Sequence, residues 1–264
     1  MLKICTQDQA FLPRDLKERF KKVKELGFDG YEIDGSLLLN NLDEVKEAIK
    51  ETGLPVVSAC GGYRGWIGDF IEEKRINGLE DIEKILEALQ EIGGKGIVVP
   101  AAWGMFTFRL PPMQSPRSLE GDRKAIIDSL KVLDKKAGET NTVVYLEPLN
   151  RYQDHMINTL ATARSIIEEG GFKNVKIIAD VYHMNIDEDE INKAVIDNKD
   201  LVRHIHVADN HRFQPGSGSI DFKKFFGTLK DINYDGNLVF ECRIRGENPE
   251  EEYKKALDYL RGCE

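Results

Sequence analysis

The stretch that decides the fold begins with Thr142-Val-Val-Tyr-Leu-Glu-Pro148, continues through Leu160–Glu169 and ends with Val175-Lys-Ile-Ile-Ala-Asp-Val181. Its outer parts are short runs rich in β-branched residues, which are typical of buried strands. The middle part repeats its apolar positions every three or four residues, as an amphipathic helix does. A strand, a helix and a second strand in this order predict two parallel strands joined by a right-handed crossover.

The same unit recurs in both directions until the chain is filled. We expect strands at Lys3–Thr6, Tyr31–Asp34, Val56–Cys60, Gly96–Ala101, Thr142–Pro148, Val175–Val181, Val202–Ala208 and Asn237–Cys242. We expect helices at Asp15–Leu26, Leu42–Thr52, Leu79–Ile92, Leu119–Ala137, Leu160–Glu169, Asp189–Asn198, Asp221–Asp231 and Pro249–Arg261. Eight such units in 264 residues predict one α/β domain over residues 1–264, a (β/α)8 TIM barrel with parallel strands. An open doubly wound sheet is the alternative, but the sequence lacks its GxGxxG and GxxxxGK[ST] phosphate motifs.

Composition excludes several classes of protein. With 41% hydrophobic and 31% charged residues the chain can bury a large core, so it is neither disordered nor collagen-like. A net charge of -9 gives no basic field for nucleic acid, and no stretch approaches 18 uncharged apolar residues, so we expect neither a nucleic acid nor a membrane partner. Cys5, Cys60, Cys242 and Cys263 form no CxxC pair, which favours reduced thiols and a cytoplasmic location.

Ionisable residues at the ends of four consecutive predicted strands are the feature that points to function. They are Glu147, Asp180, His206 and Glu241. Because neighbouring barrel strands lie about 4.8 Å apart, these side chains should converge on one point. Three carboxylates would repel one another there unless a cation neutralised them. Oxygen ligands with one imidazole suit a divalent ion, Mn²⁺, Mg²⁺, Co²⁺ or Zn²⁺.

Each of these residues taken singly has a simpler explanation, as a helix cap, an ion-pair partner or a hydrogen-bonded core histidine. Four on consecutive strands favour a common site, because the simpler explanation would have to hold four times. His204 should lie one layer deeper and serve packing or support. The long connection at 102–118 offers Trp103, Phe106 and Phe108 as walls or lid of a pocket, with packing on the surface or on a partner subunit as the alternative.

Four segments carry a family resemblance: Leu146–Thr159, Ala179–Ile186, His204–Gly218 and Val239–Cys242. They resemble the xylose isomerase-like barrel superfamily and, within it, the sugar isomerase/epimerase group that contains the D-tagatose and D-psicose 3-epimerases. The resemblance implies one divalent metal ion, with Mn²⁺ first, held by Glu147, Asp180, His206 and Glu241. It also implies that Glu147 and Glu241 move the C3 proton of a ketose through a cis-enediolate.

The same resemblance assigns substrate contacts. His183 and Arg212 match family positions that contact the substrate's oxygens. Trp103 is a candidate wall of the pocket from its place in the long connection, not from the resemblance. Gln153 stands where the epimerases usually have a glutamate that contacts substrate. Glutamine still forms hydrogen bonds but carries no charge, so the identity of the sugar is left open at this position.

The sequence therefore predicts a metal-dependent sugar epimerase, with C3 epimerisation of a ketose as the expected reaction. Aldose–ketose, hydroxypyruvate or inosose isomerisation and inosose dehydration would use the same ligands. A zinc AP endonuclease needs further histidines, whereas this chain has five in all, and a non-catalytic sugar-binding barrel is the remaining alternative. The expected partner is a small sugar, with a homodimer or homotetramer as candidate assemblies.

Three smaller features also receive predictions. Pro215-Gly-Ser-Gly218 could offer backbone N–H groups to a phosphate, but a tight turn is favoured. Asp154 and His155 are expected to be solvated loop residues. Cys242 should point away from the barrel axis and pack.

Overall fold

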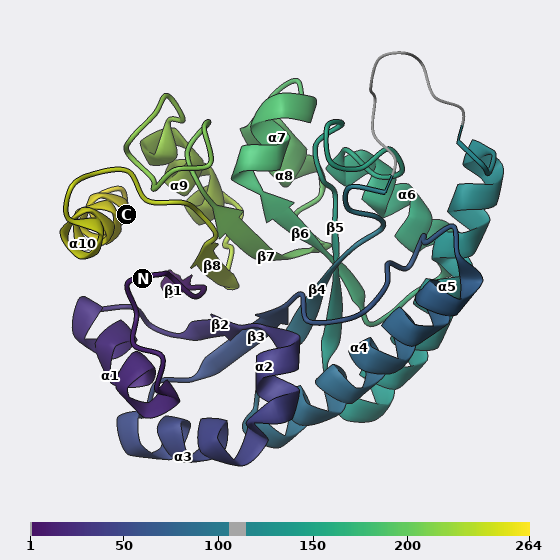
Figure 1. Cartoon of the computed structure of the whole chain (residues 1–264). Coiled ribbons are helices and arrows are strands. Elements are labelled where there is room, and N and C mark those ends of the chain that lie inside the picture. Colours follow the sequence, from purple (N-terminus) through teal and green to yellow (C-terminus); the bar gives the residue numbers. More distant parts are fainter. Residues whose placement is uncertain (1, 106–114) are drawn as a thin grey trace.

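The computed structural model describes residues 2–105 and 115–264. Within these ranges eight parallel strands pair in chain order, and the sheet closes because β8 also pairs with β1 (Figure 1). The strands are β1 (Lys3–Thr6), β2 (Tyr31–Ile33), β3 (Val56–Cys60), β4 (Gly96–Pro100), β5 (Val143–Glu147), β6 (Val175–Asp180), β7 (Val202–Val207) and β8 (Asn237–Phe240). The predicted (β/α)8 barrel is confirmed.

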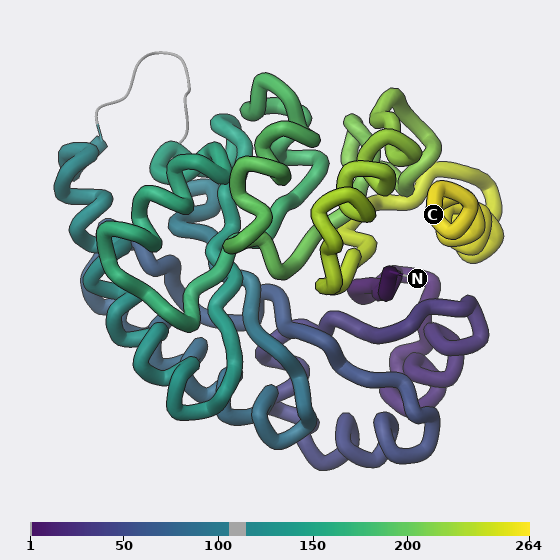
Figure 2. Tube along the Cα trace, turned by 180° about the vertical axis from the view of Figure 1, so that it is seen from behind, coloured from purple at the N-terminus to yellow at the C-terminus, as the bar shows by residue number. Residues whose placement is uncertain are grey.

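Helices surround this barrel, as both views show (Figures 1 and 2). They are α1 (Leu16–Leu26), α2 (Gly35–Asn40), α3 (Leu42–Thr52), α4 (Glu72–Ile92), α5 (Leu119–Thr140), α6 (Leu160–Gly170), α7 (Val181–Asp187), α8 (Ile191–Asp197), α9 (Phe222–Asp231) and α10 (Pro249–Arg261). The two ends of the chain lie side by side, and Nη1 of Arg261 donates to the carbonyl of Leu2 at 3.0 Å. No helix within the described residues is long and apolar enough to cross a bilayer.

The main core fills the layer between the strands and the helices. Each long helix turns one apolar face inward: in α1 this face contains Phe20 and Val23, and in α4 it contains Ile82, Ile85 and Leu86, all fully buried. Burial of side chains of this size contributes about 1.5–3 kcal/mol each relative to exposure. This packing fixes the strand ends, and with them the loops that surround the site.

Helix α4 begins earlier than its apolar periodicity predicts. The periodic pattern starts at Leu79, whereas the helix starts at Glu72. The first two turns are mostly polar. Helix α5 stabilises them, because the Arg75 guanidinium donates to the hydroxyl of Ser129 in α5 at 2.8 Å. Gly78 lets the loop before the helix approach closely, since a Cβ there would lie 2.2 Å from the carbonyl oxygen of Gly65.

Two short helices, α2 and α7, were absent from the sequence prediction. Each is capped by an aspartate at the end of the preceding strand: Asp34 directly follows β2, and Asp180 is the last residue of β6. Asp34 accepts the N–H of Leu37 at 2.9 Å, and Asp180 accepts the N–H of His183 at 3.1 Å. The sixth strand therefore stops at Asp180, although the apolar run continues in the sequence.

Candidate active site

Four ionisable side chains meet at the carboxyl ends of neighbouring strands. Glu147 is the last residue of β5, and Asp180 is the last residue of β6. His206 is the second-last residue of β7, and Glu241 directly follows β8. Asp180 pairs in register with His206, and the N–H of Glu241 donates to the carbonyl of Val207 at 3.3 Å. As a result one ligand atom from each of the four lies within 4.8 Å of every other. The convergence expected from strand position is present.

The imidazole of His206 lies at the centre of the group. Its Nδ1 is 2.9 Å from Oε2 of Glu241, 3.6 Å from Oε1 of Glu147 and 3.8 Å from Oδ2 of Asp180. Glu147, Asp180 and His206 are buried and Glu241 is partly exposed. Glu147 Oε1 and Asp180 Oδ2 are buried without any hydrogen-bond partner.

The electrostatics of the group are those of crowded carboxylates. Burial raises the pKa of Glu147 and raises the pKa of Asp180 to about 8. Burial acts in the same direction on Glu241, but the positive charges of Arg212 and His206 outweigh it and hold the pKa of Glu241 below its usual range. The three acids therefore do not share one protonation state, and a cation among them would replace protons that burial otherwise favours.

The donor set fits a divalent metal ion. Three carboxylates and one imidazole offer hard oxygen ligands and a nitrogen, with no thiolate among them. The two orphaned oxygens are the second indication, because a buried carboxylate oxygen without a donor costs free energy that a bound cation removes. These residues would hold the metal; its identity is not fixed by them.

A polar cluster directly beneath the imidazole was missed in the sequence. Glu32 of β2 is 1% exposed, and its carboxylate accepts four hydrogen bonds. Oε1 accepts from Nε2 of His206 and from Gln7, each at 2.8 Å, and Oε2 accepts from Nε2 of His204 at 2.8 Å and from Ser58 at 2.5 Å. Glu32 thus holds a proton of His206 on Nε2 and turns Nδ1 toward the three carboxylates. Nδ1 donates to Glu241 while the ring is charged, and it would offer a lone pair to a metal ion once that proton is lost.

The charges in this cluster support one another. Burial alone would lower the pKa of His206, but Glu32 and Glu241 raise it well above its ordinary value. Burial lowers the pKa of His204, which stays neutral, lies parallel to the ring of Tyr145 and leaves Nδ1 without a partner. The prediction that His204 supports the layer above is consistent with this position.

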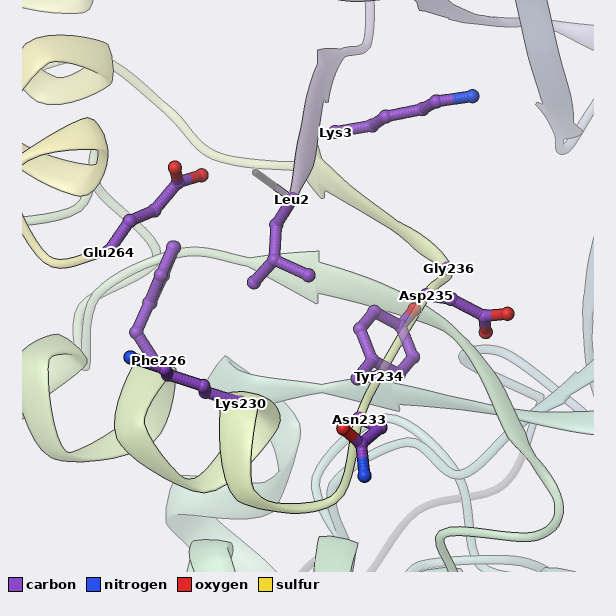
Figure 3. Close-up of a pocket in the computed structure, with 9 residues that line it drawn as sticks. All are labelled: Leu2, Lys3, Phe226, Lys230, Asn233, Tyr234, Asp235, Gly236 and Glu264. Atoms are coloured by element: carbon purple, nitrogen blue, oxygen red, sulfur yellow. The ribbon is translucent and has the colours of Figure 1, made fainter.

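A cavity of about 170 Å³ is lined by two of the four ligand residues, Glu147 and Glu241. All four predicted substrate contacts line it: Trp103, Gln153, His183 and Arg212. Trp66 lines it too, with its ring centroid 6.2 Å from that of Trp103. A larger hollow of about 640 Å³ lies at the opposite end of the barrel, between Leu2, Phe226 and Glu264, and contains none of these residues (Figure 3). The chemistry therefore belongs to the smaller cavity.

His183 and Arg212 contact each other in this cavity. Burial and the charge of Arg212 lower the pKa of His183 to about 3, so the ring is neutral. Nδ1 of the ring lies 3.0 Å from the backbone N–H of Asn150, and Nε2 lies 2.8 Å from Nη1 of Arg212. Both neighbours are donors, whereas a neutral imidazole accepts at one nitrogen only. A ligand oxygen that accepted from the Arg212 guanidinium would relieve the second contact.

The comparisons with known proteins agree with this architecture. The family model described as xylose isomerase-like TIM barrel matches residues 20–263, nearly the whole chain. This chain belongs to the xylose isomerase-like TIM barrel family.

Several sugar epimerases are similar to this chain along most of its length. A 3-dehydro-D-guloside 4-epimerase from Escherichia coli (strain K12) is 65% identical over 262 residues, 99% of this chain and 100% of that protein. A D-psicose 3-epimerase from Ruminiclostridium cellulolyticum is 32% identical over 238 residues, 88% of this chain and 79% of that protein. The apo crystal structure of a 3-keto-D-glucoside 4-epimerase from E. coli matches with a TM-score of 0.98 and 65% identity over 100% of both chains. The family member described here is therefore an enzyme of the isomerase class.

Two expectations about loop residues do not hold in this xylose isomerase-like barrel. Asp154 and His155 were expected to be solvated, but they are 0% and 8% exposed. His155 Nε2 lies 3.1 Å from Oδ2 of the buried Asp122, which also binds Arg117. The loop after β5 folds over this cluster, and no local sequence pattern marks that fold.

Two further expectations have different outcomes. Cys242 is partly buried and packs against the main core, as predicted. Phe106 and Phe108, proposed with Trp103 as pocket walls, lie outside the described residues.

Proposed function

We propose that this enzyme inverts C4 of a 3-keto hexoside, with a divalent metal bound by Glu147, Asp180, His206 and Glu241. The observation that carries the proposal is the 65% identity over 99% of this chain with the E. coli 4-epimerase. The names of the two E. coli proteins, 3-dehydro-D-guloside 4-epimerase and 3-keto-D-glucoside 4-epimerase, describe one inversion from its two sides. Gulose and glucose differ at C3 and C4, and a carbonyl at C3 leaves only C4 to invert.

The reaction needs the same chemistry as the C3 epimerisation expected from the sequence. The carbonyl is at C3 instead of C2, and the inverted carbon is C4 instead of C3. The hydrogen at C4 is acidified by the adjacent C3 carbonyl, just as the hydrogen at C3 of a ketose is acidified by C2. Removal of the proton gives an enediolate in which C3 and C4 are joined by a double bond. A divalent cation at the four ligands would stabilise the negative charge that develops on the sugar's oxygens.

Glu147 and Glu241 are the proposed acid and base. One carboxylate takes the C4 proton, and the other returns a proton to the opposite face of the same carbon, which inverts it. Their pKa values are displaced in opposite directions, upward for Glu147 and downward for Glu241, and paired groups separated in this way are the mark of acid and base roles. Both line the cavity above the metal ligands.

The remaining cavity residues orient the sugar. Arg212 would donate from its guanidinium to a substrate oxygen, and His183, with Nδ1 accepting from Asn150, would donate from Nε2 once that guanidinium has turned to the substrate. Gln153 supplies an uncharged polar group at the wall, and Trp103 supplies an apolar face at the mouth, where it is 55% exposed. A wet mouth with an aromatic wall suits a sugar ring, whose C–H face stacks on aromatic rings.

The test follows deuterium from D₂O into the sugar by NMR. Protein treated with EDTA and then resupplied with Mn²⁺ is offered a methyl 3-keto-glucoside, and the expected result is metal-dependent exchange at C4 with appearance of the C4 epimer. Glu147→Gln should abolish the exchange. Absence of C4 exchange in the metal-loaded wild type would refute the proposal.

A second candidate function is C3 epimerisation of a free ketose. It is favoured by the 32% identical D-psicose 3-epimerase, which spans most of this chain. The same NMR experiment with D-psicose and D-tagatose decides between the two, because exchange would then occur at C3 of the ketose.

A further inference from the structure

The loop between β7 and α9 is wound around one buried carboxylate. Asp209 is 1% exposed, and its two oxygens accept four backbone N–H groups of its own loop. Oδ1 accepts from Asn210 at 2.9 Å and from Ile220 at 3.1 Å, and Oδ2 accepts from Gly216 at 3.0 Å and from Gly218 at 2.9 Å. Both oxygens are therefore fully used within the loop.

The glycines of this loop are required by that arrangement. Gly216 has a φ of 86°, which disfavours other residues. A Cβ on Gly218 would lie 2.3 Å from Oδ1 of Asp209, so no side chain fits there. The tight turn predicted at 215–218 is thus present, and its N–H groups already hold an anion that belongs to the protein.

Arg212 lies in the same loop with an unfavourable backbone. Its φ is 57°, a left-handed conformation that residues other than glycine rarely adopt. Two backbone bonds hold it there: its N–H donates to the carbonyl of Asp209 at 2.7 Å, and its own carbonyl accepts the N–H of Arg243 at 2.7 Å. This conformation sends the guanidinium inward, where Nη2 lies 2.6 Å from Oε2 of Glu241.

We propose that Asp209 is a positioning residue that sets Arg212 in the substrate cavity, and that by occupying the loop's N–H groups it restricts the substrate to an unphosphorylated sugar. The second part rests on the proposed function and narrows its substrate class. Loops after the seventh and eighth strands are where many barrels of this kind bind phosphate with backbone N–H groups. Here a phosphate would have to displace a buried carboxylate of the same sign of charge.

The first test is a double-mutant cycle. Asp209→Asn keeps one acceptor oxygen but places an NH₂ group opposite two of the four N–H donors, so the loop should loosen. We expect KM for the 3-keto glucoside to rise by about ten-fold, with kcat changed less. In an Arg212→Ala background the same substitution should leave KM unchanged, because its effect acts through Arg212. KM effects that multiply in the double variant, or an unchanged KM in Asp209→Asn, would overturn the positioning role.

Asp221→Asn is the matched control. It makes the same chemical change at the exposed end of this loop, where Asp221 caps α9 by accepting the N–H of Lys224 at 2.9 Å. We expect its KM to stay at the wild-type value. A rise equal to that of Asp209→Asn would show a general loss of loop stability and would refute the specific role of Asp209.

A second readout needs no substrate. Hydrogen–deuterium exchange of the peptide that covers 210–220 should accelerate in Asp209→Asn and stay unchanged in Asp221→Asn. Unchanged protection in Asp209→Asn would overturn the proposal. If the wild type failed to act on 3-keto glycosides, the proposed function would fall, and this exchange experiment would still decide the role of Asp209.

The substrate class has its own test. The 6-phosphate of the 3-keto glucoside is compared with the free glycoside as substrate of the wild type. We expect kcat/KM for the phosphate ester to be at least about ten-fold lower, since no N–H groups of this loop remain for it. An equal or higher kcat/KM would refute the restriction to unphosphorylated sugars.

Discussion

Substitution of Glu32 by glutamine removes the negative charge beneath His206 but keeps one oxygen that can accept a hydrogen bond from the imidazole. Glutamine has one acceptor oxygen, and the cheapest orientation keeps that oxygen on His206. The other side can adapt, because the Ser58 hydroxyl rotates and His204 can move its proton to Nδ1, which has no partner in the wild type. The tautomer of His206 therefore survives, but its hydrogen bond is no longer made to a carboxylate.

The magnitude follows from the bonds lost. Of the four bonds to Glu32, the two from imidazole Nε2 at 2.8 Å are the ones that a carboxylate strengthens most. Loss of such a partner beneath a metal-binding histidine lowers metal affinity by about 10–100-fold, and with the acceptor retained we expect the lower end, about ten-fold. Glu32→Ala removes the acceptor as well and should reach the upper end, about 100-fold.

The assay is competition for Mn²⁺ against a chelating dye, with thermal unfolding of the metal-free protein measured in parallel. Ser58→Ala is the control, because it removes one neutral donor and leaves the carboxylate and both imidazoles in place. Its Mn²⁺ affinity should stay within about two-fold of the wild type. Metal affinity equal to the wild type in both Glu32 variants would refute the reasoning.

Four other outcomes are expected. Glu147→Gln and Glu241→Gln should each lower kcat by roughly 10²–10⁴-fold while the far-UV circular dichroism stays that of the wild type, and a near wild-type kcat would exclude the acid–base pair. Arg212→Ala should mainly raise KM, measured by initial rates, and an unchanged KM would remove it from the cavity. Removal of the metal by EDTA should lower Tm, and Mn²⁺ at 100 times its Kd should restore about 2.7 kcal/mol; a Tm insensitive to both would argue against a metal site. Burial raises the pKa of Asp154 from 3.8 to about 7, so the unfolded chain ionises first and the free energy of unfolding should fall by about 3 kcal/mol between pH 4 and pH 7. Asp154→Asn should remove that fall in urea titrations, and an unchanged pH dependence would contradict it.

The barrel and its rim could be predicted from the sequence because both follow from local patterns. Eight alternations of strand and helix set the topology, and the strand-end positions of Glu147 and Asp180 already place them at one rim. Helices α2 and α7 could not be found in this way. Each is shorter than two full turns beyond its cap, so too few apolar positions repeat to show a helical period.

Glu32 was missed although the rule that found Glu147 applies to it. It lies inside the short apolar strand Tyr31-Glu-Ile33, and an ionisable residue within a buried parallel strand is the same anomaly. What the sequence cannot show is the partner, because β2 and β7 are distant in the chain. Only closure of the barrel brings His206 to within 2.8 Å of this carboxylate.

Buried carboxylates of this barrel divide by whether any oxygen remains without a donor. Asp209 and Glu32 have both oxygens satisfied by the protein, so they shape the structure around them. One oxygen of Asp180 caps helix α7, and its other oxygen has no hydrogen-bond donor. Glu147 also has one oxygen without a donor, and an oxygen in this state can bind a cation. Asp154 has a bare oxygen too, but it belongs to no group of three or more metal-ligand side chains within the described residues. A bare oxygen therefore indicates a metal ligand only where other ligand groups meet it, as they do at the ends of β5 to β8.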